Sequence, residues 1–394
     1  MGTGTVRRVQ RQELPCELPG ARCWRFDVGD GNSYIPYFYN PPLDPEARRM
    51  MVVGNDGGAE QAFRLDLDHD TTTQLTSAIG RHQNWSPYIR SDVLGIRPQF
   101  VCWSQPDWQH ALYWEDNRLR WVNVDTCGDG TLFDLPASRA PSVPHCSDGG
   151  WVAWGYLRPS HQDRLQQGAA VTDLEQDLSH GCGLCVYDLA THELVLDLET
   201  PFWPNHVAAS PDHRWILYCH EGAWSDQRMY LYDVARDASR PLRPQHDGAR
   251  IGHEFWIDPT TVGYHGDGDG RGFFGTIDVE TGERIERPSP HGTGGHYGHY
   301  HVAPDRRAIV TDGEVTPDAI SIAPLDDGEL DFRPICRHNW ARDQDQRHHP
   351  HPHWHRSGRY ITFTGCERRQ DGTVHTFPCL LELPSDHLEF TDRQ

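Results

Sequence analysis

The sequence contains no lysine, so arginine supplies all 36 residues of its Lys-plus-Arg total. Against these stand 57 aspartate and glutamate residues, which leave a formal net charge of −21. This excess of negative charge argues against nucleic acid or an anionic membrane surface as the main partner, because both would be repelled. A small anionic ligand would need a local cluster of arginine, or a metal ion, to offset the field.

Targeting segments and a disulfide framework are also missing. No apolar run approaches the length that spans a bilayer, and residues 1–8 lack the apolar core of a secretion signal. The 11 cysteines are odd in number and scattered, and Cys182 and Cys185 have no second CxxC motif to complete a zinc site. We therefore expect a protein of the reducing cytoplasm, with no membrane partner.

Helical periodicity is nearly absent from the chain. Short runs of valine, isoleucine, tyrosine, phenylalanine and tryptophan recur instead, separated by Asp-Gly, Pro-Asp and glycine-rich turns. This pattern is typical of the short strands of an all-β fold.

The strand pattern repeats at intervals of about 45 residues, the length of one four-stranded propeller blade. Three copies begin with a histidine six residues before an aspartate or serine in the first turn, namely His206, His299 and His351. A fourth copy begins at His253. Less regular copies fit residues 50–75, 99–135 and 145–198.

Seven such units predict an all-β, seven-bladed β-propeller that occupies residues 1–394 as one domain. Residues 23–27 form a strand-like segment near the N-terminus. We expect this segment to pair with residues 380–383 and so complete the last blade, which removes an open sheet edge.

Residues 346–358 are unusually rich in histidine, with five among thirteen positions. Alternate side chains of an extended strand point to the same face, so His349 and His351 would aim at one point. The intervening prolines are tolerated where a strand begins. Together with the amide oxygen of Gln346, these two imidazoles would form an open metal site; the alternative is a solvated histidine-rich loop.

Equivalent positions on neighbouring inner strands lie around one end of a propeller's central channel. The repeat therefore directs His206, His253 and His299 toward the same funnel as the pair His349 and His351. One histidine at such a position is usually bonded to a neighbouring backbone. Five that converge favour a functional site.

Three stretches resemble the oligogalacturonate lyases, polysaccharide lyase family 22. They are residues 217–230 (LYCHEGAWSDQRMY), 252–256 (GHEFW) and 346–352 (QRHHPHP), and residues 73–76 (TQLT) are similar to the end of blade one in that family. The resemblance implies a seven-bladed propeller that holds a divalent metal, usually manganese, through three histidines and one glutamine. It also implies β-elimination of short galacturonides derived from pectin.

The resemblance assigns metal positions to Gln346, His349 and His351. The remaining histidine ligand comes from residues 296–301, where we choose His299 from its register with His351. His301 and His296 remain as alternatives.

The resemblance also makes Arg228 the match of the catalytic arginine and His253 the match of the proposed base. Arg228 stays charged at any working pH and can hold a carboxylate with two parallel bonds; the alternative is an ion pair at the edge of a blade. We expect His206, His220 and Trp256 to line the sugar sites, although each of them could equally be structural.

Elimination across C4–C5 of a uronate begins with loss of the weakly acidic C5 proton. Binding of the adjacent carboxylate to a cation stabilises the charge that develops, and a neutral His253 would take the proton. Three imidazoles and an amide oxygen suit Mn²⁺, or Fe, Co or Ni, better than a closed zinc site.

Two other readings compete with a galacturonide lyase. One is a propeller lyase that acts on another uronic-acid oligosaccharide. The other is a non-catalytic propeller that binds or scaffolds, although such a protein has no reason to cluster glutamine and histidine. Hydrolases that carry propellers need a nucleophile domain, and no GxSxG motif occurs. At residues 257–260 (IDPT) the chain departs from the Pro-Asp-Gly turn that is frequent in the family.

Overall fold

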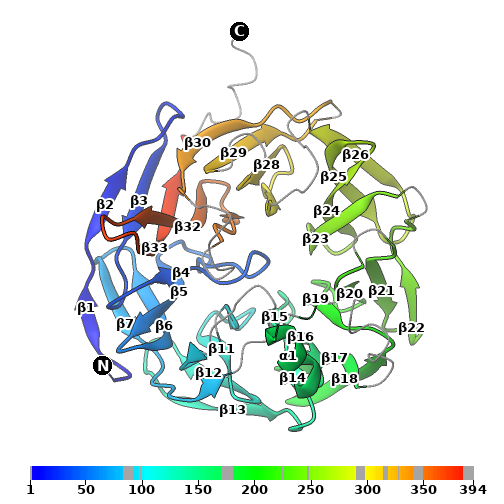
Figure 1. Ribbon diagram of the computed structural model, residues 1–394, viewed down its shortest axis with the longest axis horizontal. Helices are drawn as coiled ribbons and strands as arrows, with labels where there is room; N and C mark the ends of the chain where they lie inside the picture. The colour runs from blue at the N-terminus through cyan, green and yellow to red at the C-terminus, as the bar shows by residue number, and fades with distance from the viewer. Residues whose placement is uncertain are drawn as a thin grey trace. The chain divides into compact units, whose positions relative to one another are not determined.

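The computed structural model describes residues 2–82, 93–97, 99–167, 169, 181–223, 226–245, 248–289, 298–313, 318–326, 328–339 and 349–384. These residues form seven sheets of four or five strands and one two-stranded sheet (Figure 1). The seven sheets are the blades of a β-propeller, and the predicted fold class is confirmed.

The chain packs as two compact units, and the first contains Met1–Ser77, Gly270–Phe273 and Arg287–Gln394. Because the chain divides in this way, the single domain expected over residues 1–394 stays a prediction. The sheets of the first unit are β1-β7-β6-β5-β4, β2-β3-β33-β32-β31 and β27-β28-β29-β30. Their strands are β1 (Val6–Arg8), β2 (Arg11–Leu14), β3 (Arg22–Phe26), β4 (Ser33–Tyr34), β5 (Arg49–Asp56), β6 (Ala59–Asp66), β7 (Thr71–Gln74), β27 (Tyr300–Val302), β28 (Ala308–Thr311), β29 (Ala319–Pro324), β30 (Arg333–Arg337), β31 (His353–Trp354), β32 (Tyr360–Arg368) and β33 (Val374–Glu382).

The second unit contains Ala78–Asp269 and Phe274–Glu286. Its sheets are β10 to β13, β14 to β18, β19 to β22, most of β23 to β26, and the two-stranded β8-β9. Its elements are β8 (Arg81–His82), β9 (Val93–Leu94), β10 (Val101–Trp103), β11 (His110–Glu115), β12 (Arg118–Asn123), β13 (Asp129–Asp134), β14 (Ala140–Pro141), β15 (His145–Cys146), β16 (Trp151–Leu157), α1 (Pro159–Gln166), β17 (Cys182–Asp188), β18 (Glu193–Thr200), β19 (Pro204–Ala209), β20 (Trp215–His220), β21 (Met229–Asp233), β22 (Ala238–Pro241), β23 (Arg250–Trp256), β24 (Thr261–Gly268), β25 (Arg271–Asp278) and β26 (Arg284–Ser289).

The position of a strand in its blade explains its sequence. The inner strand β19 and the second strand β20 are buried along nearly their whole length, because neighbouring blades cover both faces. The outermost strand β18 alternates between exposed and partly buried residues, as expected where one face meets water. Apolar side chains between blade three (β14 to β18) and blade four (β19 to β22) form one continuous core cluster that includes Leu184, Val207 and Ile216.

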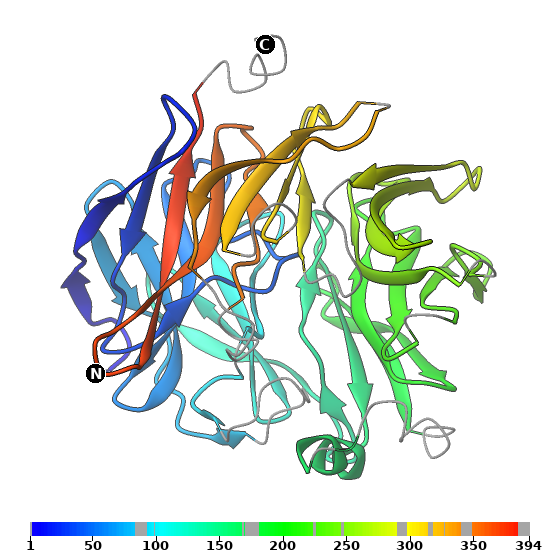
Figure 2. The same ribbon diagram turned by 45° about the horizontal axis from the view of Figure 1, so that its top comes forward.

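The N-terminal segment ties two blades of the first unit together. β3 pairs with β33, with Cys23 opposite Leu381 and Arg25 opposite Cys379. β1 instead pairs with β7 in the sheet of blade one. Figures 1 and 2 both show β3 beside β33, so the expected pairing of the N-terminal strand with the last blade is present.

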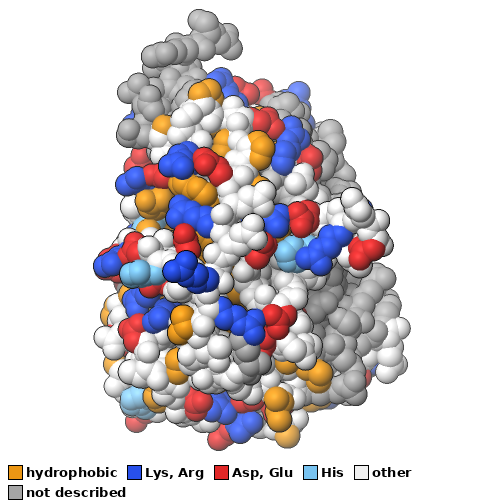
Figure 3. Space-filling view, turned by 90° about the vertical axis from the view of Figure 1, so that its left-hand side faces the viewer, with side chains coloured by type: hydrophobic (Ala, Val, Ile, Leu, Met, Phe, Trp, Pro, Cys, Tyr) orange, Lys and Arg blue, Asp and Glu red, His pale blue; other side chains and the backbone are white. Residues whose placement is uncertain are grey.

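On the face that carries β1 and β2, arginines and carboxylates are interspersed (Figure 3). Arg7 pairs with Asp30 at 2.7 Å and Arg48 pairs with Asp68 at 2.6 Å. Such exposed pairs are screened by solvent, so they balance charge more than they stabilise the fold. Among the described residues, no helix is both long and apolar enough to cross a membrane.

Candidate functional site

Three buried histidines of the first unit lie together at the starts of two inner strands. His299 directly precedes β27, whereas His349 and His351 precede β31. Their ligand nitrogens all lie within 4.8 Å of one another. Two nitrogens on one ion lie about 3 to 4 Å apart when each metal bond is about 2.1 Å, so a small inward movement would let all three bind a cation.

Asp312, which was not identified from the sequence, contacts both His299 and His351. Its carboxylate accepts from the His299 backbone N–H at 2.7 Å and lies 2.9 Å from Nδ1 of the same residue. It also accepts from the His351 backbone N–H at 3.2 Å. Burial opposes ionisation, but the His299 ring and these hydrogen bonds hold the pKa of Asp312 below its ordinary value.

Hydrogen bonds show which histidine of blade six, the sheet of β27 to β30, has a nitrogen that can bind a metal. Nδ1 of His299 faces a carboxylate that can only accept, so its lone pair is on Nε2 and can bind a metal. Nδ1 of His301 instead accepts from the Trp354 backbone N–H at 3.3 Å. A neutral His301 ring then carries its proton on Nε2 and offers no lone pair there. This contrast supports His299, while His296 and Gln346 lie outside the described residues.

The histidine-rich stretch is not the extended strand that its alternation suggested. Strand β31 begins only at His353, and His351 has a left-handed φ of +49°. The His353 ring lies tilted against that of His301, with ring centroids 4.0 Å apart, and Nε2 of His355 lies 3.0 Å from the Asp44 carbonyl oxygen. The extended-strand prediction is therefore wrong at His351, because one left-handed residue breaks the alternation of side chains.

Aromatic side chains after β4 form one wall of the histidine cluster. The Tyr37 ring meets His351 edge-on, with centroids 4.9 Å apart, and the Phe38 ring lies 5.4 Å from His299. Both aromatic residues are buried. Burial lowers the pKa of His349 to about 3, so this imidazole is neutral and suited to bind a cation.

His338 is a further buried histidine, and it lies beside Asp312. Its Nε2 lies 3.1 Å from the Asp312 carbonyl oxygen, and burial lowers its pKa to about 4 from 6.5. The unfolded chain therefore binds more protons below pH 6.5, so His338 makes the fold less stable as pH falls from 6.5 toward 4. Glutamine at 338 keeps the hydrogen-bond donor but does not titrate.

We expect the His338→Gln variant to lose less stability on acidification than the unaltered chain. Between pH 7.5 and 5.0 the difference should be roughly 2 kcal/mol in the free energy of unfolding. Urea unfolding at both pH values, with chelator present, measures it. Equal losses in the two proteins would show that His338 does not titrate as described.

A second cluster of side chains, in the second unit, surrounds Arg228, which is only 2% exposed. Its Nε donates to Glu254 Oε2 at 3.2 Å, and Nη2 lies 3.8 Å from Glu221 Oε2. Burial opposes the charge, but the carboxylates of Glu254 and Glu221 outweigh it and raise the pKa of Arg228. Nη1 is buried and makes no hydrogen bond to the described residues, so it could receive an anionic ligand.

His206, Cys219 and Glu254 also bring possible metal ligands within 4.8 Å of one another. Three observations argue against a cation there. The Arg228 guanidinium already contacts Glu254, and Nδ1 of His206 lies 2.9 Å from the same carboxylate. Burial raises the pKa of the Cys219 thiol well above its usual value, so it remains protonated and binds metal poorly. We therefore interpret Arg228, Glu254, Glu221, His206 and Cys219 as a network of contacts around a buried arginine, and call it the arginine network.

The predicted base, His253, lies beside this arginine network. Its ring stacks with that of His206, with centroids 5.6 Å apart, and Nδ1 lies 2.9 Å from Nε2 of His265. Both His206 and His253 have left-handed φ values, +47° and +43°. Backbone of this kind is uncommon outside glycine and gathers at functional sites. His265 was not identified from the sequence.

Known proteins were compared with the chain by sequence and by fold. No protein-family model matches it. The oligogalacturonate lyase of Dickeya dadantii (strain 3937) is 22% identical over 258 residues, which are 61% of this chain and 59% of that protein. An oligogalacturonate lyase in complex with manganese superposes with a TM-score of 0.77 at 21% identity, covering 98% of this chain and 100% of that one. An oligogalacturonate lyase from Vibrio parahaemolyticus gives 0.80 at 18% identity, with the same coverage.

The predicted resemblance to oligogalacturonate lyases is confirmed. At these identities the two solved oligogalacturonate lyase structures show a shared fold. The chain spans 59% of the length of the Dickeya enzyme that it matches.

The other predicted substrate contacts have ordinary structural partners. The His220 ring stacks on Phe202 with centroids 4.2 Å apart, and burial, with Arg228 nearby, lowers its pKa to about 4. Nε1 of Trp256 donates to the Ala208 carbonyl oxygen at 3.0 Å. Their roles in sugar binding stay predictions, as does that of His206.

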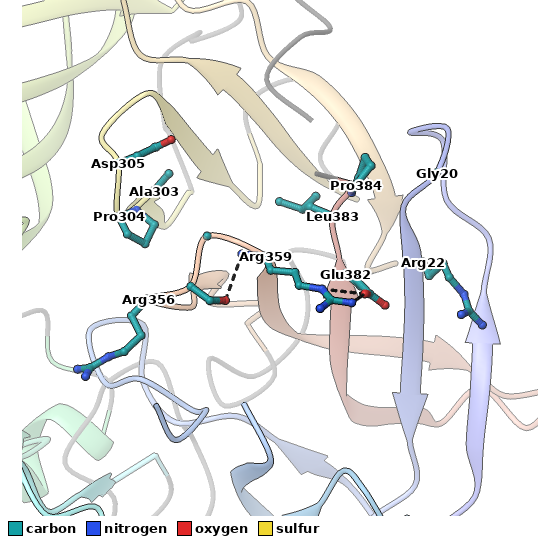
Figure 4. A pocket seen from close by; sticks show the side chains of 12 residues that line it. Gly20, Arg22, Ala303, Pro304, Asp305, Arg356, Arg359, Glu382, Leu383 and Pro384 are labelled. Atoms are coloured by element: carbon teal, nitrogen blue, oxygen red, sulfur yellow. Dashed lines mark hydrogen bonds and ion pairs between the residues drawn. The ribbon is translucent and has the colours of Figure 1, made fainter. Parts of the chain in front are cut away.

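A pocket of about 950 Å³ in the first unit does not contain the histidine cluster. Figure 4 shows it between the turn at 303–305, the turn at 356–359 and strand β33. Its charged side chains are largely compensated, since Arg359 bonds to Glu382 and Arg22 to Glu13. We therefore place the candidate site at the buried histidines, with the arginine network as a second candidate.

Proposed function

We propose that this chain is a metal-dependent lyase that cleaves short, saturated or unsaturated galacturonides by β-elimination and releases 5-keto-4-deoxyuronate. The observation that carries the proposal is the buried cluster of His299, His349 and His351 with Asp312 behind it. The similarity of the chain to oligogalacturonate lyases supports the same reaction. The substrate would be a small acidic oligosaccharide produced by pectin degradation.

The donor set fits a divalent cation. Three neutral imidazoles leave the ion its full charge, and in the neutral His299 ring the carboxylate beside Nδ1 places the proton there, so the lone pair on Nε2 can bind the ion. Manganese is the first candidate, because it is the metal of one oligogalacturonate lyase of this fold. Such an ion would supply positive charge to the uronate carboxylate and so acidify the C5 hydrogen.

The reaction also needs a base and a group that binds a carboxylate, and the sequence resemblance gives these roles to His253 and Arg228. His253 takes the C5 proton at a ring nitrogen, and the electron pair of the C5–H bond becomes the C4–C5 double bond. The C4–O4 bond breaks with its electron pair on O4, which takes a proton from water and leaves as the hydroxyl of the released sugar. Arg228 binds a substrate carboxylate or the charge that develops on it, while Glu254 and Glu221 hold the guanidinium in place. General-base catalysis of this kind is typically worth about 10²- to 10⁴-fold.

Digalacturonate tests the proposal. We expect galacturonate and the keto-sugar as products when Mn²⁺ is present, and no turnover after chelation. Disaccharides of glucuronate and of ulvan type belong in the same assay, because a faster reaction on one of them would replace the proposed substrate with another uronide. Absence of turnover on all of them would favour the non-catalytic binding protein.

We expect Asp312→Asn to weaken Mn²⁺ binding by about 10- to 100-fold, as removal of such supporting carboxylates usually does. The amide keeps the shape but loses the charge, and it cannot accept hydrogen bonds at both terminal atoms. Competition with a fluorescent chelator measures the dissociation constant. His301→Asn is the matched control, since asparagine can replace the acceptor at Nδ1, and its affinity should equal that of the unaltered chain. Equal affinities in the Asp312→Asn variant and the unaltered protein would contradict the role of Asp312.

A further inference from the structure

The hairpin of β23 and β24 places a second histidine directly against the proposed base. Gly252 lies opposite His265 in the register, and the register shifts between Gly252 and Phe255. This bulge turns the His253 side chain so that its Nδ1 lies 2.9 Å from Nε2 of His265. A β-carbon at Gly252 would lie 3.1 Å from that same Nε2, so a glycine there leaves the His265 ring its place.

Two neutral imidazoles at this distance share one proton, and its position decides which atom of His253 is basic. If Nδ1–H of His253 donates to His265, the lone pair of His253 is on Nε2, the nitrogen that does not face His265. In the opposite arrangement His253 carries its proton on Nε2 and cannot take another proton there without first losing it. A general base therefore requires the first arrangement.

We propose that His265 is a positioning residue, which accepts a hydrogen bond from Nδ1 of His253 and thereby makes Nε2 the atom that receives the C5 proton. This inference rests on the proposed function. It adds the residue that fixes the tautomer and orientation of the base.

Blade six shows the same arrangement with a different partner. There the histidine before the first strand, His299, has its Nδ1 2.9 Å from the carboxylate of Asp312. A carboxylate stabilises the imidazolium form and raises the pKa of a histidine, which would keep a base protonated at neutral pH. A neutral partner such as His265 orients the base without that charge. Each hairpin thus gives its histidine the partner that its proposed chemistry needs.

Among the residues that the structure describes, the other titratable groups near His253 have partners of their own. The His206 ring stacks with it at 5.6 Å, and Nδ1 of His206 is directed to Glu254. Glu254 itself follows His253 in the chain, but its carboxylate is held by Arg228 at 3.2 Å and by His206. The Glu254–Arg228 pair balances its own charge.

Three substitutions at position 265 test the proposal, because glutamine and glutamate both reach the place of Nε2. His265→Gln offers a neutral acceptor, and we expect kcat within about tenfold of the unaltered enzyme and an unchanged pH profile. His265→Leu removes the acceptor and should lower kcat by about 10- to 100-fold, as loss of such supporting groups does. His265→Glu should move the acid limb of kcat/KM upward by about one to three pH units.

His110→Gln is the control, since this half-buried histidine lies on β11, in another blade, with Asp107 and Asn123 among its contacts. It should change neither kcat nor the pH profile. A merely structural His265 would give lower activity in the Gln, Leu and Glu variants with no change in the pH profile. That result would overturn the proposal.

Nitrogen NMR of ¹⁵N-labelled histidine tests the same hydrogen bond without turnover. The signals of His253, identified by their loss in His253→Gln, should show a protonated Nδ1 and an unprotonated Nε2 above the pKa. A protonated Nε2 would overturn the proposal for His265. An unaltered enzyme that is inactive on every uronide would instead reject the proposed function, and the NMR result would still decide the position of the proton.

Discussion

Replacing His351 with asparagine will abolish both metal binding and turnover. His351 has no solvent exposure, lies with His299 and His349 in the histidine cluster, and has a left-handed backbone that asparagine tolerates better than most residues. Loss of groups that merely support a metal ligand costs up to about a hundredfold in affinity, so loss of a ligand should cost more. Equilibrium dialysis with Mn²⁺ and the digalacturonate assay measure the two effects.

His355→Gln is the matched control for this experiment. His355 belongs to the same stretch and the same sequence parity, but its Nε2 is 3.0 Å from the Asp44 carbonyl oxygen, a bond that the glutamine amide can make. We expect unchanged metal content and unchanged kcat. Full activity in the His351→Asn variant, or equal losses in both variants, would exclude a specific role for His351.

Replacing Arg228 with lysine will lower kcat/KM on digalacturonate by about 10²- to 10³-fold, the usual effect of removing a donor that stabilises developing charge. Lysine keeps the positive charge beside Glu254 and Glu221 but loses the planar fork and the second donor for a carboxylate. Arg243→Lys is the matched control, because Arg243 is also buried and bonds to Glu286 at 2.7 Å. Its kcat/KM should stay within a few-fold of that of the unaltered enzyme.

Variants that remove the charge of Arg228 show separately what this residue contributes to stability and to activity. Arg228→Met alone leaves Glu254 buried without its cation, which we expect to cost about 3 to 5 kcal/mol in the free energy of unfolding. Combining it with Glu254→Gln removes the uncompensated charge and should restore much of that stability. The double variant should nevertheless remain inactive. A folded double variant with substantial kcat/KM would show that Arg228 serves the fold and not the reaction.

The blades were predictable because their signals are local. Runs of strand-forming residues recur with turn-forming residues between them, and the pairing of residues 23–27 with residues 380–383 followed from the need to close a sheet edge. The proximity of His299 to His351 was also predictable, because both precede the turn of their repeat by six residues.

The partners of these histidines were not predictable from spacing. Asp312 meets His299 only through the register of β27 and β28, in which Tyr300 lies opposite Thr311. His265 meets His253 only because a bulge interrupts β23. A hairpin alignment that placed the second strand against the first would have indicated Asp312, whereas the bulge leaves no clear signal in the sequence.

The left-handed residues explain the one argument that failed. Side-chain alternation assumes an extended backbone, and His351 departs from it with a φ of +49°. His353 and His355 share the parity of His349 and His351, but the His353 ring contacts that of His301 and His355 bonds to the Asp44 carbonyl oxygen. The role of Gln346, outside the described residues, stays a prediction.

The most direct test of the account is the rate of elimination on digalacturonate as a function of bound metal. Protein stripped by chelator should be inactive, and added Mn²⁺ should restore the rate in proportion to the ion bound, with a plateau at one ion per chain. A full rate with no bound metal would contradict the account, as would a plateau that the His351→Asn protein also reaches.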